Sequence, residues 1–312
     1  MKSMELRLPL EVVVQTGKLR PIGGSSNMST HDTRPKIIRR IISLVPSATE
    51  ILYFLELEAR VIGVTEHCNY PEKAQSKYKV GTFGYPQLSK ILSLQPDIVL
   101  VDGALHRNLI EKLQKNKIEV LVATPTNIDD IFILMGKLGD MSKTEVTVLP
   151  LISTLKERIG NLSYKSILRK PRVFRLMSLD PLVTPGPSSF QYDALRLAGA
   201  QLMDLPSNVP YVNVSWNQII EFDPEVILFC GVHKGQPLPL KCKGCIVKNP
   251  ICHRTADDII TEKWEHITAV RDNRMQPISC DTICRPGPRL IDGIEKLHRL
   301  FQNVGMQKYK GS

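Results

Sequence analysis

Two ten-residue segments of this chain share one pattern, and that pattern restricts the fold more than any other feature. Residues 91–100 read ILSLQPDIVL and residues 219–228 read IIEFDPEVIL. Each combines an apolar helix end, a turn of proline followed by an acidic residue, and an apolar run typical of a buried strand. The repetition indicates two α/β lobes of similar construction, although such connections also arise independently in unrelated proteins.

Strand-like and helix-like segments alternate around both copies. Apolar, β-branched runs predict strands at residues 37–45, 61–64, 97–101, 119–123, 173–177 and 225–229, and helical patterns are found at residues 88–94, 108–115, 128–138, 143–162, 189–198 and 216–222. Ser47 to Glu50 have the spacing of a capping box, which predicts a helix N-terminus at Ser47. This alternation is typical of parallel sheets covered by helices on both faces.

The chain of 312 residues is longer than one hydrophobic core usually supports, so two lobes are expected. We expect a flexible tail at residues 1–36, a first lobe at 37–141, a long connecting helix at 142–168, a second lobe at 169–303 and a short tail at 304–312. A cysteine-rich insert at residues 238–256 interrupts the second lobe.

Composition excludes several classes of function. The net charge is +10, but no basic stripe interleaved with aromatic residues is present, so we expect no nucleic-acid partner. No apolar run is long enough to span a membrane, and the first thirty residues lack the apolar core of a secretory signal. These features predict a cytoplasmic protein, with import into an organelle as the alternative, and we expect a monomer.

Five motifs resemble one known family and cover about residues 38–303. They are RIISLVPSATE at 40–50, VIGVTEHCNYP at 61–71, GTFG at 81–84, Pro-Asp at 96–97 and RPGPR at 285–289. They resemble the periplasmic-binding-protein-like family of vitamin B12 and iron-chelate receptors, in particular its cobalamin-binding branch. The resemblance implies the class III substrate-binding fold, in which two Rossmann-like α/β lobes with parallel sheets are joined by a long backbone helix.

The resemblance also implies a function without covalent chemistry, namely binding of a metal chelate such as a cobalamin-like corrinoid in the cleft between the lobes. The residues at the family's contact positions are Ser47, His67, Phe83, Pro187, Ser188 and Arg285. The imidazole of His67 is a candidate axial ligand to cobalt or iron, at a position where the family more often has tyrosine. Ser47 and Phe83 have structural alternatives, as a helix cap and as a core residue.

The sequence departs from the family at two places. Receptors of this family use one exposed acidic residue on each lobe to meet arginines of a transporter permease. Glu50 matches the first position, but Asn217 stands at the second, which puts permease docking in doubt. An aromatic residue after the last strand is replaced by Thr282 or Ile283, which weakens the case for a corrin ring.

Seven cysteines suggest an additional metal site. Cys242, Cys245 and Cys252 lie in a polar, lysine-rich insert, and Cys280 and Cys284 lie beside the RPGPR motif. Thiolates at such spacing suit Zn²⁺ or an iron–sulfur cluster, and spacing does not separate the two. Buried free thiols are the alternative. No serine triad, phosphate-binding loop or spaced carboxylate pair is present, so an iron–sulfur enzyme or electron carrier, the alternative function, rests on these cysteines alone.

Overall fold

The computed structural model describes residues 12–13, 37–164, 169–236 and 254–307. The chain divides into two compact units. Unit 1 comprises Met1–Thr124 and Leu134–Leu149, and unit 2 comprises Pro125–Ile133 and Pro150–Ser312. Among the described residues, every helix is too short or too polar to cross a membrane.

Unit 1 is built on a five-stranded sheet with the order β1-β5-β4-β2-β3. Its strands are β1 (Val12–Val13), β2 (Ile41–Ser43), β3 (Val61–Val64), β4 (Ile98–Val101) and β5 (Glu119–Val122). The last four are parallel to one another, whereas β1 pairs antiparallel with β5 from within the segment predicted as a tail. All four residues of β4 are buried, as expected for a parallel strand covered on both faces.

The helices of unit 1 follow the strands in the predicted alternation. They are α1 (Pro46–Phe54), α2 (Leu88–Ser93) and α3 (Arg107–Lys115), with short 3₁₀ turns at Glu58–Arg60 and Glu72–Ser76. The predicted capping box at Ser47 is wrong, because α1 begins at Pro46 and no side chain caps it. Proline suits the first helical position, since it has no N–H group to satisfy there.

Unit 2 contains a parallel sheet and a small antiparallel sheet. The parallel sheet has the order β11-β10-β6, with β6 (Val173–Leu176), β10 (Val226–Cys230) and β11 (Met275–Ile278). The antiparallel sheet, which the sequence patterns did not predict, consists of β7 (Ser178–Leu179), β8 (Leu182–Pro185) and β9 (Tyr211–Asn213). Phe174, Phe229 and Trp264 are fully buried in the core that forms around the two sheets.

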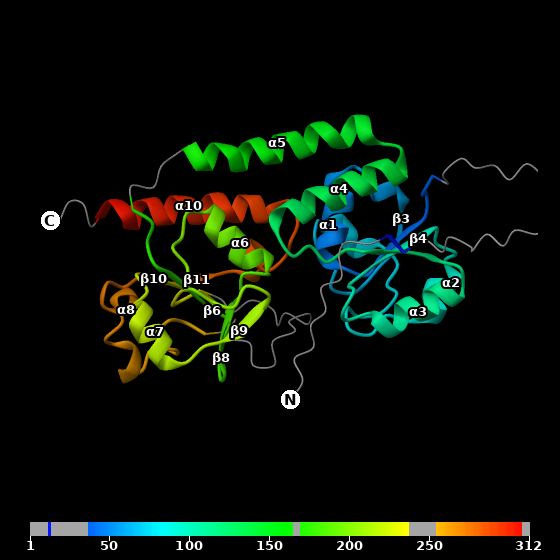
Figure 1. Cartoon of the computed structure of the whole chain (residues 1–312). Helices are drawn as coiled ribbons and strands as arrows, with labels where there is room; N and C mark the ends of the chain where they lie inside the picture. The colour runs from blue at the N-terminus through cyan, green and yellow to red at the C-terminus, as the bar shows by residue number, and fades with distance from the viewer. Residues whose placement is uncertain (1–11, 14–36, 165–168, 237–253, 308–312) are drawn as a thin grey trace, which may run out of the picture. The chain divides into compact units, whose positions relative to one another are not determined.

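The helices of unit 2 are α6 (Phe190–Leu197), α7 (Trp216–Phe222), α8 (Thr268–Arg271), α9 (Cys280–Ile283) and α10 (Arg289–Gln307), with a 3₁₀ turn at Glu262–Trp264. The long α10 packs against α9 and against α6, which lies beside it in Figure 1. Two further helices, α4 (Ile128–Ser142) and α5 (Glu145–Tyr164), contribute residues to both units.

The two ten-residue segments fold in the same way. In each, a residue with left-handed backbone, Gln95 or Asp223, ends the helix before the proline. The following Asp97 Oδ2 accepts hydrogen bonds from the N–H groups of Arg39 and Arg40, and Glu225 Oε2 accepts one from the N–H of Arg172.

An arginine that precedes the neighbouring strand completes each copy. Arg40 donates to the carbonyls of Leu94 and Gln95 at the end of α2. Arg172 donates in the same way to the carbonyls at the end of α7, those of Phe222 and Asp223. This shared hydrogen bonding supports the interpretation that the two α/β units are similar in construction.

Candidate functional site

The candidate ligand residues of unit 1 lie at one edge of its sheet. Ser47 follows β2 and His67 follows β3, while Phe83 lies in the connection from β3 to α2. The chain leaves β2 toward β3 on one side and returns to β4 on the other, so the topological switch point lies between β2 and β4. Open α/β sheets bind ligands at this place, beyond the carboxyl ends of the strands.

Three rings gather at this edge. The rings of His67 and Phe83 lie 6.3 Å apart between centroids, and the rings of Phe83 and His106 meet edge to face at 5.5 Å. The Phe83 backbone lies between the imidazoles, since its N–H donates to His67 Nδ1 at 3.0 Å and its carbonyl lies 2.7 Å from His106 Nε2. We call His67, Phe83 and His106 the ring cluster.

Hydrogen bonding determines which nitrogen of His67 carries the proton. Because Nδ1 accepts the Phe83 N–H, the neutral imidazole is protonated at Nε2. This Nε2 is buried and has no hydrogen-bond partner among the described residues. His67 Nε2–H is therefore a donor that a ligand can use once the atoms covering it are displaced, whereas axial coordination through Nε2 requires the opposite tautomer and loss of the Phe83 contact.

The motifs did not point to His106. It follows β4, is 2% exposed, and its Nδ1 accepts the N–H of Asp102 at 2.9 Å, so the Nε2–H donates to the Phe83 carbonyl. Burial lowers the pKa of this imidazole, against smaller opposing effects of the Phe83 carbonyl and Asp102. The available signal was its position, in the loop after the strand of the first ten-residue segment.

Two residues of α1, one predicted to contact the ligand and one predicted to dock to a permease, are buried. Ser47 is 4% exposed and lies one residue inside the helix rather than at its cap. Glu50 is 3% exposed, so its carboxylate does not have the surface position that docking to a permease arginine requires. The expectation of an exposed acidic residue at this position is therefore not met.

The candidate ligand residues of unit 2 come from two segments. Pro187 and Ser188 are half-buried between β8 and α6, where Ser189 rather than Ser188 caps the helix by accepting the N–H of Tyr192. Arg285 follows α9, and its Nε lies 3.6 Å from a carboxylate oxygen of Asp281. All three predicted residues are partly accessible.

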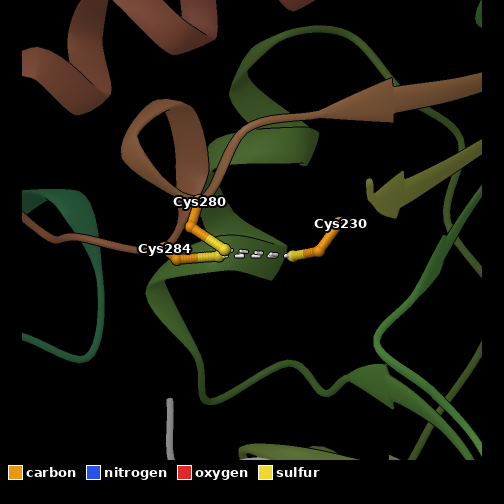
Figure 2. Close-up of side chains that lie close together, drawn as sticks. All are labelled: Cys230, Cys280 and Cys284. Carbon is orange, nitrogen blue, oxygen red and sulfur yellow. Dashed lines mark hydrogen bonds between the residues drawn. The ribbon is translucent and has the colours of Figure 1, made fainter. Parts of the chain in front are cut away.

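Three cysteines of unit 2 converge at the carboxyl edge of its parallel sheet. Cys230 is the last residue of β10, and Cys280 and Cys284 stand one helical turn apart at α9. Figure 2 shows Cys280 and Cys284 approaching Cys230 from the opposite side. The Cys230 sulfur lies 3.6 Å from that of Cys280 and 3.9 Å from that of Cys284, and all three sulfurs lie within 4.8 Å of one another. We call these residues the thiol cluster.

A buried arginine faces the thiol cluster. Arg175 of β6 is 1% exposed, and its guanidinium lies 2.7 Å from the Cys230 sulfur and 3.8 Å from the Cys284 sulfur. Its other hydrogen bond among the described residues is to the Leu176 carbonyl at 3.5 Å. Since a buried cation is costly without an anion, the cluster must supply negative charge.

The thiols differ in acidity. Hydrogen bonds from Cys280 and Cys284, with help from Arg175, hold the pKa of the Cys230 thiol well below its usual value, and burial opposes them only in part. Donation to Cys230 raises the pKa of Cys284 to about 12 and is the first cause of a raised pKa at Cys280. Cys230 is therefore the thiolate of the group.

The predicted metal ligands are only partly accounted for. Cys280 and Cys284 belong to the thiol cluster, whereas Cys242, Cys245 and Cys252 lie outside the described residues. Cys230 was not predicted because it lies at the end of a strand, far in sequence from the paired cysteines. Its place at the end of the strand of the second ten-residue segment was the signal that could have identified it.

Known proteins of similar sequence are binding proteins. A vitamin B12-binding protein of Vibrio parahaemolyticus is 26% identical over 270 residues, which are 86% of this chain and 90% of that protein. A Bacillus subtilis protein named as an uncharacterized ABC transporter substrate-binding lipoprotein is 25% identical over 83% of this chain and 78% of its own length.

Solved structures show the same fold. The periplasmic vitamin B12 binding protein of Vibrio cholerae superposes with a TM-score of 0.69 at 23% identity, covering 87% of this chain and 99% of that one. The periplasmic heme-binding protein RhuT of Roseiflexus gives a TM-score of 0.68 at 19% identity, covering 86% and 99%. These matches confirm the predicted α/β fold of the class III substrate-binding proteins.

The comparisons correct the predicted location. A cytoplasmic protein, or one imported into an organelle, is contradicted by relatives that are periplasmic binding proteins and a lipoprotein. The prediction depended on the lack of a recognisable secretory segment, and such a lack does not report where a chain works. The family of periplasmic binding proteins matches residues 41–275. The chain belongs to this periplasmic binding protein family.

Proposed function

We propose that this protein is a receptor that reversibly binds a metal chelate of the corrinoid or heme class. The single observation that carries the proposal is the ring cluster, which combines an aromatic ring with an unpartnered Nε2–H at the ligand-binding edge of unit 1. The names of the relatives, which bind vitamin B12 or heme, support the same ligand class.

The residues suit a large, flat, partly charged ligand. Phe83 is half-buried and offers an aromatic surface to a macrocycle, and His67 Nε2–H can donate to an acceptor on its periphery. On unit 2, the guanidinium of Arg285 suits a propionate or phosphate group. The family has an aromatic ligand contact after the last strand. Ile283, which stands at this place, is fully buried and so does not replace that contact.

Covalent catalysis is not part of this function. The family and the relatives are binding proteins, and the iron–sulfur enzyme or electron carrier considered from the sequence has no support among them. Delivery of the chelate to a transporter permease is the corresponding partner role, in keeping with the name of the Bacillus subtilis relative. Docking would then use a residue other than Glu50, which is buried.

Absorbance titration tests the ligand class. The full chain is titrated separately with cyanocobalamin, hemin and a ferric trihydroxamate, and we expect a saturable spectral change with cyanocobalamin or hemin and none with the trihydroxamate. Phe83→Ala should weaken that binding about tenfold, the equivalent of about 1.4 kcal/mol. Tyr85→Ala is the matched control, because Tyr85 lies in the same loop but is 84% exposed. Equal affinity of the Phe83→Ala variant and the parent would rule out the ring cluster as the binding site.

A further inference from the structure

The spacing of the thiol cluster matches the coordination shell of a single ion. Zinc–sulfur bonds are about 2.3 Å long, which places neighbouring sulfurs about 3.8 Å apart in a tetrahedral site and about 4.0 Å apart in a trigonal one. The two distances from the Cys230 sulfur are 3.6 and 3.9 Å. No side chain has to move far for all three sulfurs to reach one ion.

The same spacing argues against an iron–sulfur cluster at these three residues. Cysteines that ligate different irons are held apart by the body of the cluster, so their sulfurs are more widely separated than sulfurs that share one ion. Here all three sulfurs lie within 4.8 Å of one another. At Cys230, Cys280 and Cys284 the geometry therefore favours a single ion over an iron–sulfur cluster.

The charge of the surroundings also fits a divalent ion. Three thiolates and a divalent cation carry one net negative charge, and the guanidinium of Arg175 carries one positive charge. The assembly is therefore neutral, as a half-buried site requires. Arg175 is 1% exposed and has no carboxylate partner in an ion pair within the described ranges, so its charge is available for this purpose.

We propose that Cys230, Cys280 and Cys284 bind one thiophilic divalent cation of the zinc class, with Arg175 as the buried counter-charge. On binding, the thiols that are still protonated release their protons to solvent, and three metal–sulfur bonds form. Three protein ligands leave a fourth position for water or another donor. The ion ties α9 to the end of β10 and thereby holds the segment that carries Arg285.

Cobalt substitution tests the site directly. The full chain is reduced, freed of metal and titrated with Co²⁺, whose thiolate complexes have a charge-transfer absorption in the near ultraviolet. We expect one Co²⁺ per chain, displaced by Zn²⁺, and protection of the three cluster thiols from alkylation. Cys230→Ser should weaken binding at least about 100-fold, since it replaces a ligand. Absence of a charge-transfer band in the reduced parent would overturn the proposal.

Two controls separate this site from other cysteines. Cys68→Ser changes a buried thiol of unit 1 whose hydrogen-bond partners among the described residues are Thr49, Thr65 and the Ser43 carbonyl, and it should leave Co²⁺ binding unchanged. A variant with Ser at positions 242, 245 and 252 should also retain one Co²⁺. Loss of the ion from that variant would contradict the proposal, because the three cluster thiols would then be insufficient.

The role of Arg175 as counter-charge is tested separately, by the Co²⁺ affinity of Arg175 variants. Arg175→Met should weaken Co²⁺ binding about 10- to 100-fold, the usual effect of removing a group that supports metal ligands, and Arg175→Lys should recover part of the loss. Thermal unfolding and circular dichroism identify variants that fail to fold. If Arg175→Met does not fold, the comparison of Cys230→Ser with Cys68→Ser still decides the question. Equal affinity in a folded Arg175→Met variant would remove the counter-charge from the proposal.

Discussion

The tautomers of the two histidines determine what each residue of the ring cluster can bind. The Phe83 backbone donates to one imidazole and accepts from the other, so His67 and His106 each keep their proton on Nε2. His106 is thereby a buried structural residue, while the Nε2–H of His67 has no hydrogen-bond partner among the residues that the structure describes. The resemblance to known receptors identified His67 and Phe83, but only the folded loop shows that His106 joins them.

Protonation of His106 should destabilise the protein at acidic pH. A second proton on Nδ1 removes the acceptor of the Asp102 N–H, and burial lowers the pKa of the imidazole below its ordinary 6.5. The unfolded chain then binds more protons than the native state below about pH 6.5, so stability falls as the pH falls through that range. Denaturant unfolding between pH 7 and 5 should show this loss in the parent. His106→Gln should show a smaller loss, and an identical pH profile would refute the assignment.

Ion binding by the thiol cluster should strengthen as the pH rises. Cys230 is the most acidic thiol, whereas the pKa values of Cys280 and Cys284 are raised, the latter to about 12. Two protons must therefore leave when an ion binds, which gives a change in affinity of up to about 100-fold per pH unit. Co²⁺ titrations at pH 6, 7 and 8 measure the slope. A slope near zero would mean that the ion is not bound by these thiols.

At the scale of elements, the alternation of strands and helices was predicted, including short elements such as β3 and α7, whereas the antiparallel sheet and the start of α1 were not. The helical patterns at residues 128–138 and 143–162 correspond to α4 and α5. The antiparallel sheet was missed because its strands are short. The start of α1 was misplaced because the helix begins at Pro46, before the cap that was predicted at Ser47. The duplicated connection was predictable because its turn needs a proline, an acidic residue and a buried strand in fixed order.

The duplicated connection predicts matched effects in the two units. Arg40→Met removes hydrogen bonds to the end of α2 and should lower the free energy of unfolding by about 1 kcal/mol. Arg172→Met should have a larger effect, because Arg172 Nη1 also lies 3.7 Å from the fully buried carboxylate of Glu225. Arg39→Met is the control, since in the part of the chain that the structure describes Arg39 bonds to Asp97 through its backbone N–H, which the substitution keeps. Denaturant unfolding gives the three values, and no loss in either variant would refute the shared role.

At the scale of the whole molecule, the fold and the receptor class were predictable, whereas the location and the thiol cluster were not. Fold and class follow from motifs spread over most of the chain. The cellular location was mispredicted because the first thirty residues, from which it was inferred, contain no motif that identifies a cellular compartment. The cluster depends on residues far apart in sequence, Arg175, Cys230 and Cys284, which the parallel pairing of β10 with both β6 and β11 brings together.

Ligand binding should change the dimensions of the molecule little. The division between the two units falls between Ile133 and Leu134 inside α4, and between Leu149 and Pro150 inside α5. Two helices therefore continue from one unit to the other. A continuous helix resists bending better than a flexible linker. Small-angle scattering of the free and ligand-bound protein should therefore give nearly the same radius of gyration. A clear compaction on binding would show that the helices bend.

Isothermal titration calorimetry of the full chain with cyanocobalamin and with hemin tests the central claim, that this protein is a metal-chelate receptor. We predict saturable binding of one of the two chelates at one site per chain, and a weaker affinity for His67→Ala because the Nε2–H donor is lost. Binding of neither chelate by the folded, reduced protein would contradict the account.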